Sequence, residues 1–267
     1  MAYARISELS LHYQISGDGP ALVFAHGGAG NHLSWWQQVP EFDRDMTVVT
    51  FDHRGFGLSR DEARGSAPHR FVDDLEALLD HLNIDRAALV GQSMGGITVA
   101  GFASQHPERV TALVLCDTPA GIVTDAIAAV LSAMPAEGDA ALGSAHGKAF
   151  HHEFATREPH LAFLYGLIDG LNDQPIPNLI PTLTSMINDP APVNDHRIPT
   201  LVVVGSDDAI TPPSALRSLP DAIPHASFIE VAQAGHSPYF EQATVFNDVL
   251  RGFLEEQGVL ESTEPKP

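Results

Sequence analysis

The segment ALVGQSMGGIT, residues 88–98, passes from one apolar run into another through glycines at 91, 95 and 96 and a serine at 93. Glycine inside a helix or strand costs ~0.5–1 kcal/mol relative to alanine. The backbone shape at this joint therefore matters more than local propensity. The pattern indicates either an ordinary tight turn or a turn that must present Ser93 to its surroundings.

Short, continuously apolar runs recur along the chain at 21–25, 46–51, 87–91, 112–116, 200–205 and 226–231. Runs of this length, rich in β-branched residues, are typical of strands buried on both faces of a parallel sheet. A roughly alternating stretch over 6–16 predicts one more strand. Helical periodicity predicts helices over 71–82, 97–105 and 240–254. Strands that alternate with helices predict an α/β fold, with a mostly parallel sheet wrapped by helices.

One long region breaks this alternation. Roughly eighty residues between the runs at 112–116 and 200–205 contain no strand-like segment, which is too long for a simple crossover. The region is rich in helical pattern punctuated by proline and glycine. It predicts a helical cap over 121–196, inserted into a core domain made of 1–120 and 197–260, with a flexible tail over 261–267.

The cap is expected to select the substrate, because it leaves and re-enters the sheet at the carboxyl ends of the strands. Its apolar residues exceed what one exposed helix carries, and they include Phe154, Leu161, Phe163, Leu164 and Leu167. We expect Phe163 or Leu164 to contact the substrate. A cap that only completes the hydrophobic core is the alternative.

Composition limits the possible partners. The formal net charge of -20 argues against nucleic acid and anionic membranes, since both would repel the chain. No stretch approaches the ~20 apolar residues of a spanning helix, and the first residues lack the apolar core of a signal peptide. The single cysteine, Cys116, excludes an intrachain disulfide and is expected to be buried. We expect a soluble, cytoplasmic protein that binds a small molecule.

Ser93 lies between a predicted buried strand and a predicted helix, which is the context of a nucleophile elbow. A serine hydroxyl is a weak nucleophile without a base, so a histidine and an acid must accompany it. In this arrangement the acid and then the histidine follow the serine in the chain. Asp207 and Asp208 follow the run at 200–205, and His236 follows the run at 226–231.

Five motifs in this order and spacing resemble those of the α/β-hydrolase superfamily, and the resemblance covers almost the whole chain. They are HGGAG (26–30), FDHRGFGLS (51–59), GQSMGG (91–96), GSDDAITPP (205–213) and AGHSPYFEQ (234–242). The resemblance implies that Ser93 is the nucleophile, that His236 is the general base and then the general acid, and that Asp208 orients His236. Asp207 is the nearest competitor for the acid. Asp117 is a more distant one, because some members take their acid from that strand.

The same resemblance assigns the oxyanion hole to backbone N–H groups of Gly28 and Met94, with Gly27 as the alternative to Gly28. It leaves Asp52 and Arg54 as structural partners of the loop that carries them. His26 is expected to brace its own loop.

The resemblance also limits the chemistry. Serine at the elbow, where relatives with an epoxide hydrolase or dehalogenase activity carry aspartate, implies acyl transfer to water without a cofactor or a metal. The expected substrate is a small, neutral or weakly polar carboxylic ester or lactone. A cofactor-free haloperoxidase or perhydrolase, a C–C hydrolase, a lyase of menaquinone biosynthesis and a non-enzymatic small-molecule receptor remain alternatives.

A histidine-rich group in the cap offers a possible metal site. It consists of His146, His151, His152 and Glu153. These residues lack the HExxH or CxxC spacing of metal ligands. We therefore predict a solvated helix face here and no bound metal.

Overall fold

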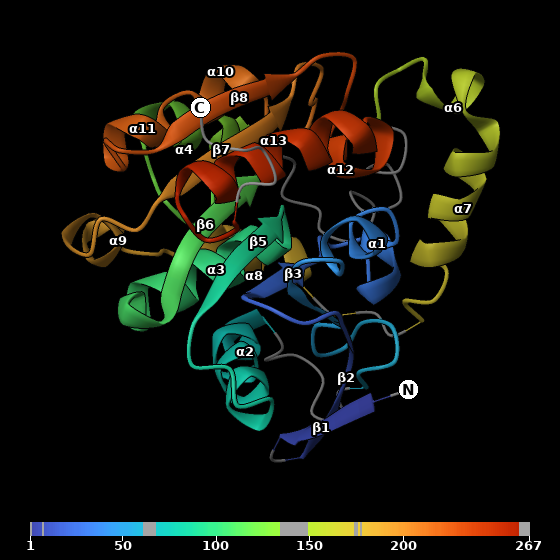
Figure 1. Cartoon of the computed structure of the whole chain (residues 1–267). Coiled ribbons are helices and arrows are strands. Elements are labelled where there is room, and N and C mark those ends of the chain that lie inside the picture. Colours follow the sequence, from blue (N-terminus) through green and yellow to red (C-terminus); the bar gives the residue numbers. More distant parts are fainter. Residues whose placement is uncertain are drawn as a thin grey trace, which may run out of the picture.

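The computed structural model describes residues 2–6, 8–60, 68–133, 149–173, 176 and 178–261. Within these residues the chain forms an eight-stranded sheet in the order β1-β2-β4-β3-β5-β6-β7-β8 (Figure 1). The strands β1 (Ala2–Ile6) and β2 (Leu9–Ser16) pair antiparallel to their neighbours, and every later pairing is parallel. The predicted α/β fold with a mostly parallel sheet is confirmed.

Each continuously apolar run forms one strand of the parallel part. These strands are β3 (Ala21–Ala25), β4 (Thr47–Phe51), β5 (Ala87–Gln92), β6 (Val110–Cys116), β7 (Thr200–Gly205) and β8 (Ser227–Val231). Every residue of β5 and β7 is buried, because helices cover both faces of the sheet at these central positions. The alternating stretch over 6–16 is predicted to form one strand. It contains the whole of β2 but only the last residue of β1, and β1 and β2 form a hairpin.

Helices cover the two faces of the sheet in two layers (Figure 1). One layer contains α2 (Phe71–His81), α3 (Met94–Gln105), α10 (Pro213–Leu216) and α11 (Leu219–Ala222). The other contains α1 (Val39–Phe42), α12 (Pro238–Glu241) and α13 (Ala243–Glu256), together with the 3-10 turn η1 (His32–Trp35). The helix predicted over 240–254 is divided at Gln242, where the backbone leaves the helical region. No helix among the described residues has the length and apolar character needed to cross a bilayer.

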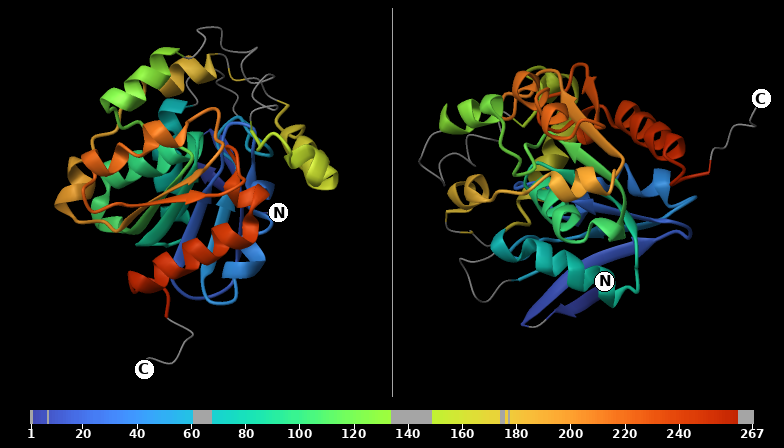
Figure 2. Two further views of the ribbon diagram at one scale, coloured as in Figure 1. Left: turned by 90° about the horizontal axis from the view of Figure 1, so that it is seen from above. Right: turned by 90° about the vertical axis from the view of Figure 1, so that its left-hand side faces the viewer.

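The segment between β6 and β7 is helical where it is described, in agreement with the sequence pattern. It contains α4 (Asp125–Ala133), α6 (Phe154–Arg157), α7 (Pro159–Asp169), α8 (Leu179–Ser185) and α9 (Ala191–Asp195). Figure 2 shows α4, α7 and α8 on the side of the molecule away from the C-terminus. The segment also contributes to the core, because Phe154 and Ile168 are buried in the same apolar cluster as Phe240. The predicted tail beyond Glu261 lies outside the described residues.

Candidate active site

The turn after β5 places Ser93 in a strained conformation. Its φ of 51° and ψ of -113° are unusual for a residue with a side chain. A Cβ on Gly91 would lie 2.5 Å from the carbonyl oxygen of Gly95, and a Cβ on Gly95 would collide with the carbonyl oxygen of Ala25. The glycines two residues before and after Ser93 are therefore required by the sharp reversal of the chain.

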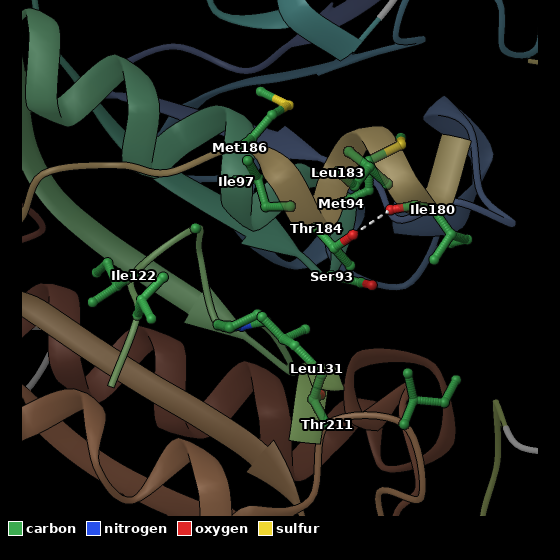
Figure 3. Close-up of a pocket in the computed structure, with 14 residues that line it drawn as sticks. Ser93, Met94, Ile97, Ile122, Leu131, Ile180, Leu183, Thr184, Met186 and Thr211 are labelled. Atoms are coloured by element: carbon green, nitrogen blue, oxygen red, sulfur yellow. Dashed lines mark hydrogen bonds between the residues drawn. The ribbon is translucent and has the colours of Figure 1, made fainter. Parts of the chain in front are cut away.

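Neighbouring groups anchor this turn. The Ser93 N–H donates to the Cys116 carbonyl at 2.9 Å, and the Thr118 hydroxyl donates to the Ser93 carbonyl at 2.7 Å. The side chain of Ser93 is half-buried and lines a cavity (Figure 3). The turn therefore presents the hydroxyl to a space large enough for a ligand.

Asp208 and His236 form a buried pair at the ends of two neighbouring strands. His236 Nδ1 lies 2.8 Å from Asp208 Oδ2. The Thr211 hydroxyl donates a hydrogen bond to the same oxygen at 2.7 Å. The amides of Ile210 and Thr211 donate to Asp208 Oδ1 at 2.8 and 2.9 Å. Burial raises the pKa of Asp208, but the His236 charge and the hydrogen bonds from His236 and Thr211 outweigh it and hold the pKa below its ordinary value.

The two competing acids are placed differently. Asp207 is exposed, and its carboxylate accepts from the Ser206 hydroxyl at 2.6 Å. Asp117 is fully buried at the end of β6, and its Oδ1 accepts from the Gly205 N–H at 2.9 Å. The structure thus brings Asp208 into contact with His236 Nδ1, at the position predicted for the orienting acid.

Two cavities, of about 110 and 100 Å³, meet at Ser93. Figure 3 shows the larger one, with Ser93 and α8 side chains on one side and Leu131 and Thr211 on the other. The larger cavity is lined by Ser93, Met94, Ile97, Pro119, Gly121, Ile122, Val123, Leu131, Ile180, Leu183, Thr184, Met186, Ile210 and Thr211. The smaller one is lined by Gly28, Ala29, Gln92, Ser93, Met94, Ala149, Tyr165, Ile180, Leu183, Ile210 and His236. The linings are mainly apolar, and no lysine or arginine of the described residues belongs to either.

The smaller cavity gathers the predicted nucleophile, the predicted base and the predicted oxyanion-hole residues. Ser93, His236, Gly28 and Met94 all line it. No hydrogen bond joins Ser93 to His236 in the described part of the chain, and such contacts often tighten only when substrate binds. Met94 is the first residue of α3, so the N–H that it carries has no partner within the helix.

Gln92 is a site residue that sequence reasoning missed. Its Nε2 donates to the His236 carbonyl at 2.8 Å, and its side chain lies against Gly27, where a Cβ would collide with Oε1. Gln92 therefore connects the loop of the predicted oxyanion hole to the loop of His236. Its position between Gly91 and Ser93 in the elbow motif was the available signal.

Two buried histidines support the loop after β3. His26 Nδ1 lies 2.8 Å from the Gly27 carbonyl oxygen, and the backbone N–H of His53 donates to His26 Nε2 at 2.9 Å. His26 thus braces its own loop, as expected, and also the loop that carries His53. Burial lowers the pKa of His26 to about 4 and that of His53 well below its ordinary value.

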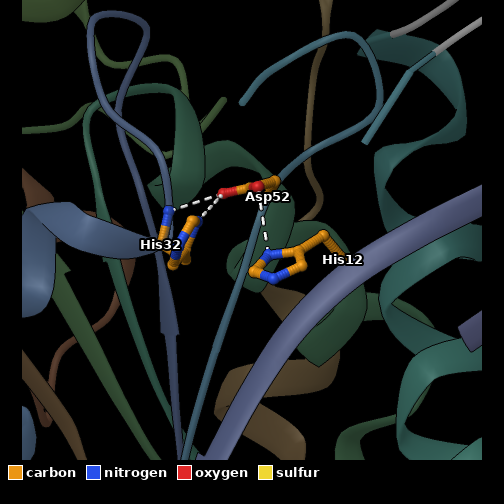
Figure 4. Close-up of side chains that lie close together, drawn as sticks. All are labelled: His12, His32 and Asp52. Atoms are coloured by element: carbon orange, nitrogen blue, oxygen red, sulfur yellow. Dashed lines mark hydrogen bonds and ion pairs between the residues drawn. The ribbon is translucent and has the colours of Figure 1, made fainter. Parts of the chain in front are cut away.

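Asp52 forms a second buried carboxylate–histidine group (Figure 4), which the sequence did not predict. The carboxylate lies between two imidazole rings, 2.7 Å from His32 Nδ1 and 3.3 Å from His12 Nδ1. It also accepts from the backbone N–H groups of His32 at 2.6 Å and Leu58 at 2.8 Å. Burial raises the pKa of Asp52, but the His12 and His32 side chains beside the carboxylate lower it by more, so the net shift is downward.

Asp52 and Arg54 contact neighbouring elements and line neither cavity around Ser93. The guanidinium of Arg54 is buried and lies 2.6 Å from the Asp74 carboxylate on α2. Both residues therefore act as structural partners of the loop that follows β4.

The expectation that Phe163 or Leu164 lines the pocket is wrong. Phe163 is 69% exposed, and Leu164 packs on the apolar cluster beside the sheet. Neither lines a cavity that contains Ser93. Other residues of the segment between β6 and β7 line the cavities, among them Leu131 from α4, Tyr165 from α7, and Ile180, Leu183 and Met186 from the region of α8. Phe163 and Tyr165 are two residues apart on one helix, so they project from nearly opposite faces, and apolar character alone does not show which face is inward.

The histidine-rich group between β6 and β7 is only partly solvated, contrary to the prediction. His152 and Glu153 are exposed, whereas His151 is buried and its backbone N–H donates to Glu241 Oε2 at 2.7 Å. Glu241 Oε1 accepts from the Gly235 N–H at 2.8 Å. Glu241 therefore connects the segment that carries His151 to the loop of His236. His146 lies outside the described residues.

Comparison with known proteins places this geometry in a family. The family model described as the alpha/beta hydrolase fold matches residues 20–149 and 147–243. The chain is 30% identical to a 2-hydroxy-6-oxo-6-phenylhexa-2,4-dienoate hydrolase of Comamonas testosteroni, over 96% of each chain. It is 30% identical to a 3-oxoadipate enol-lactonase of Acinetobacter baylyi, over 92% of this chain and 93% of the other.

A solved structure of a thermophilic esterase from Thermogutta terrifontis matches with a TM-score of 0.80 and 25% identity, covering 93% of this chain and 94% of the esterase. The fold, the family model and both relatives agree over nearly the full length. The chain belongs to the α/β-hydrolase fold family.

Proposed function

We propose that this chain is a serine hydrolase that cleaves a small, uncharged carboxylic ester or lactone through an acyl-enzyme on Ser93. One observation carries the proposal: a strained serine and a buried Asp208–His236 pair meet at one cavity. Strained backbone concentrates at functional sites, and a nucleophile beside an oriented histidine is the signature of covalent catalysis.

The geometry suggests a role for each group. Asp208 accepts a hydrogen bond from the N–H of His236 Nδ1, which leaves Nε2 as the free base toward Ser93. Ser93 Oγ attacks the substrate carbonyl carbon as Nε2 takes its proton, and the oxyanion is held by the N–H groups of Gly28 and Met94. His236 then protonates the leaving oxygen. Water repeats the sequence and releases the acid.

The cavity lining supports an uncharged substrate. The similar proteins of known name include a dienoate hydrolase and a 3-oxoadipate enol-lactonase, whose substrates carry carboxylates. A buried carboxylate is costly without a cationic partner, and no lysine or arginine of the described residues lines either cavity. The apolar walls formed by residues such as Ile180 and Leu183 favour an aliphatic or aromatic group beside the scissile bond.

We also propose that the segment 121–196 acts as a cap over a core domain formed by 1–120 and 197–260. The support is that residues from α4, α7 and α8 line the cavities at Ser93, whereas the predicted nucleophile, acid and base all lie on loops of the sheet. In this division the core performs the chemistry and the cap selects the substrate.

Turnover profiling tests the proposed function. The purified chain is assayed with p-nitrophenyl esters of increasing acyl length, with neutral lactones, with a dienoate for C–C cleavage, and with acetate and peroxide for peracid formation. Hydrolysis of esters or lactones that exceeds the other activities supports the proposal. Preference for the dienoate or for peracid formation would replace it with a C–C hydrolase or a perhydrolase, and thermal-shift binding without turnover would replace it with a receptor.

A further inference from the structure

Asp117 is a buried acid to which the catalytic scheme above assigns no role. Its side chain is fully buried, and its φ of 47° lies in the left-handed region. The Gly205 N–H donates to Oδ1 at 2.9 Å, and the Cys116 thiol lies 3.1 Å from Oδ2. The loop geometry therefore holds this carboxyl group in one place.

The Asp117 carboxyl group is close to the predicted acid–base pair. One oxygen of Asp117, one of Asp208 and one ring nitrogen of His236 all lie within 4.8 Å of one another. Both acids are buried, and two ionised carboxylates this close in a buried place repel each other, so one of the two is expected to carry a proton.

The surrounding donors decide which acid carries that proton. Asp208 accepts from two backbone amides, from the Thr211 hydroxyl and from His236. Asp117 has one amide donor and a thiol, which is a weak donor. Burial and the neighbouring Asp208 raise the pKa of Asp117 well above its usual range, whereas that of Asp208 is lowered. Contacts and charge agree that Asp208 is ionised and Asp117 is neutral.

We propose that Asp117 is a positioning residue, a neutral carboxylic acid whose O–H donates to the Asp208 carboxylate. Asp117 keeps its proton throughout, so no bond to the substrate is made or broken there. The additional donor fixes the direction of Asp208 and draws off part of its negative charge. His236 then returns its proton to the leaving group more readily than it would beside an unmodified carboxylate. The effect on catalysis rests on the proposed function, whereas the protonation state of Asp117 does not.

Two substitutions separate a donor role from a structural one. Asp117→Asn keeps a donor toward Asp208 and an acceptor for Gly205, and asparagine tolerates the left-handed backbone. We expect its kcat and its pH profile with a p-nitrophenyl ester to match those of the parent chain. Asp117→Ala removes the donor, and we expect kcat to fall roughly 10- to 100-fold, the range for a hydrogen bond to a charged group, with KM little changed.

The acid limb of kcat/KM gives a second readout. Among the described residues, the titratable groups beside Asp117 are Cys116 on its own strand, Asp208 after β7 and His236 after β8. Without the donor, Asp208 attracts the imidazolium of His236 more strongly, so the acid limb of the kcat/KM profile should move to higher pH in Asp117→Ala.

An acid limb that moves to lower pH in Asp117→Asn would show that Asp117 is charged. Unchanged kinetics in Asp117→Ala, with only a lower Tm, would show a merely structural role. Either result overturns the proposal.

Infrared spectroscopy tests the proton itself without any substrate. The difference spectrum of the parent chain minus Asp117→Asn, recorded at neutral pH, should contain the carbonyl stretch of a protonated carboxylic acid. Loss of an ionised carboxylate band in its place would overturn the proposal even if esterase activity is found. Absence of ester and lactone turnover together with the protonated-acid band would instead contradict the proposed function and leave the protonation assignment standing.

Discussion

The molecule contains two buried carboxylate–histidine groups that are nearly alike in local geometry. Asp208 lies 2.8 Å from His236 Nδ1, and Asp52 lies 2.7 Å from His32 Nδ1. Both carboxylates accept additional backbone N–H groups, and both have a lowered pKa. The difference lies in the surroundings, because His236 shares a cavity with Ser93, whereas Asp52 and His32 line neither cavity at Ser93. A buried acid–histidine contact alone therefore does not identify an active site, and a nucleophile and an open space are needed beside it.

The largest expected effect is the removal of the nucleophile that distinguishes the two groups. Ser93→Ala should lower kcat for ester hydrolysis on the order of 10⁴–10⁶-fold, the range for deletion of a triad member. A phosphonate probe should label the parent chain at Ser93, as located by peptide mass spectrometry. Labelling that persists in Ser93→Ala would place the nucleophile elsewhere.

Matched substitutions at the two carboxylates test the comparison directly. Asp208→Asn should lower kcat by about 10⁴-fold, because the amide favours the wrong imidazole tautomer, while the fold is largely kept. Asp52→Asn replaces one of the two acceptor oxygens of this buried carboxylate with an NH2 group, and a buried donor left without its acceptor costs about 1–3 kcal/mol of unfolding free energy. Activity per folded molecule should remain near that of the parent chain.

The measurement combines kcat with chemical denaturation for both variants. Equal losses of kcat in folded Asp52→Asn and Asp208→Asn would remove the functional distinction between the groups. A normal kcat in Asp208→Asn would return the acid role to Asp117 or Asp207.

Much of this architecture is predictable from the sequence because each signal is local. Strands such as β5 and β7 appear as apolar runs since both faces are buried, and the elbow appears through glycines that admit no side chain. The Asp52 group is different. His12, His32 and Asp52 come from three separate segments, and only their meeting in the folded chain gives them a common environment. The inward face of α7 likewise depends on which side packs, so Tyr165 could not be distinguished from Phe163.

A third prediction concerns acid stability and the histidines that support the loop after β3. Burial lowers the pKa of His26 from 6.5 to about 4, so between these values the unfolded chain binds a proton that the folded chain excludes. The stability due to neutral His26 is fully present above pH 6.5 and is lost as the pH falls toward 4. The shift corresponds to roughly 3 kcal/mol of unfolding free energy.

Urea denaturation between pH 7 and pH 4 checks this expectation. The free energy of unfolding should fall less steeply with acid in His26→Asn than in the parent chain. His160→Asn is the control, because His160 is exposed and should leave the slope unchanged. Identical slopes in all three proteins would mean that His26 is protonated in the folded state at the same pH as in the unfolded state.

The smallest expected effect concerns substrate choice by the proposed cap. Two of its apolar residues differ in their surroundings, as the two carboxylate groups do. Leu131 lines the larger cavity, whereas Phe163 is 69% exposed and lines neither. Leu131→Ala should enlarge the larger cavity, so the ratio of kcat/KM for long over short acyl esters should rise. Pocket contacts of methylene size are worth about 1–3 kcal/mol of discrimination.

Phe163→Ala is the control, because it removes an apolar side chain that lines neither cavity, and it should leave the ratio unchanged. Phosphonate labelling at Ser93 should stay equal in both variants, since neither touches the reacting groups. A ratio that changes in Phe163→Ala and not in Leu131→Ala would show that substrate enters by a different face of the cap, and equal ratios in both would limit the cap to supporting the core.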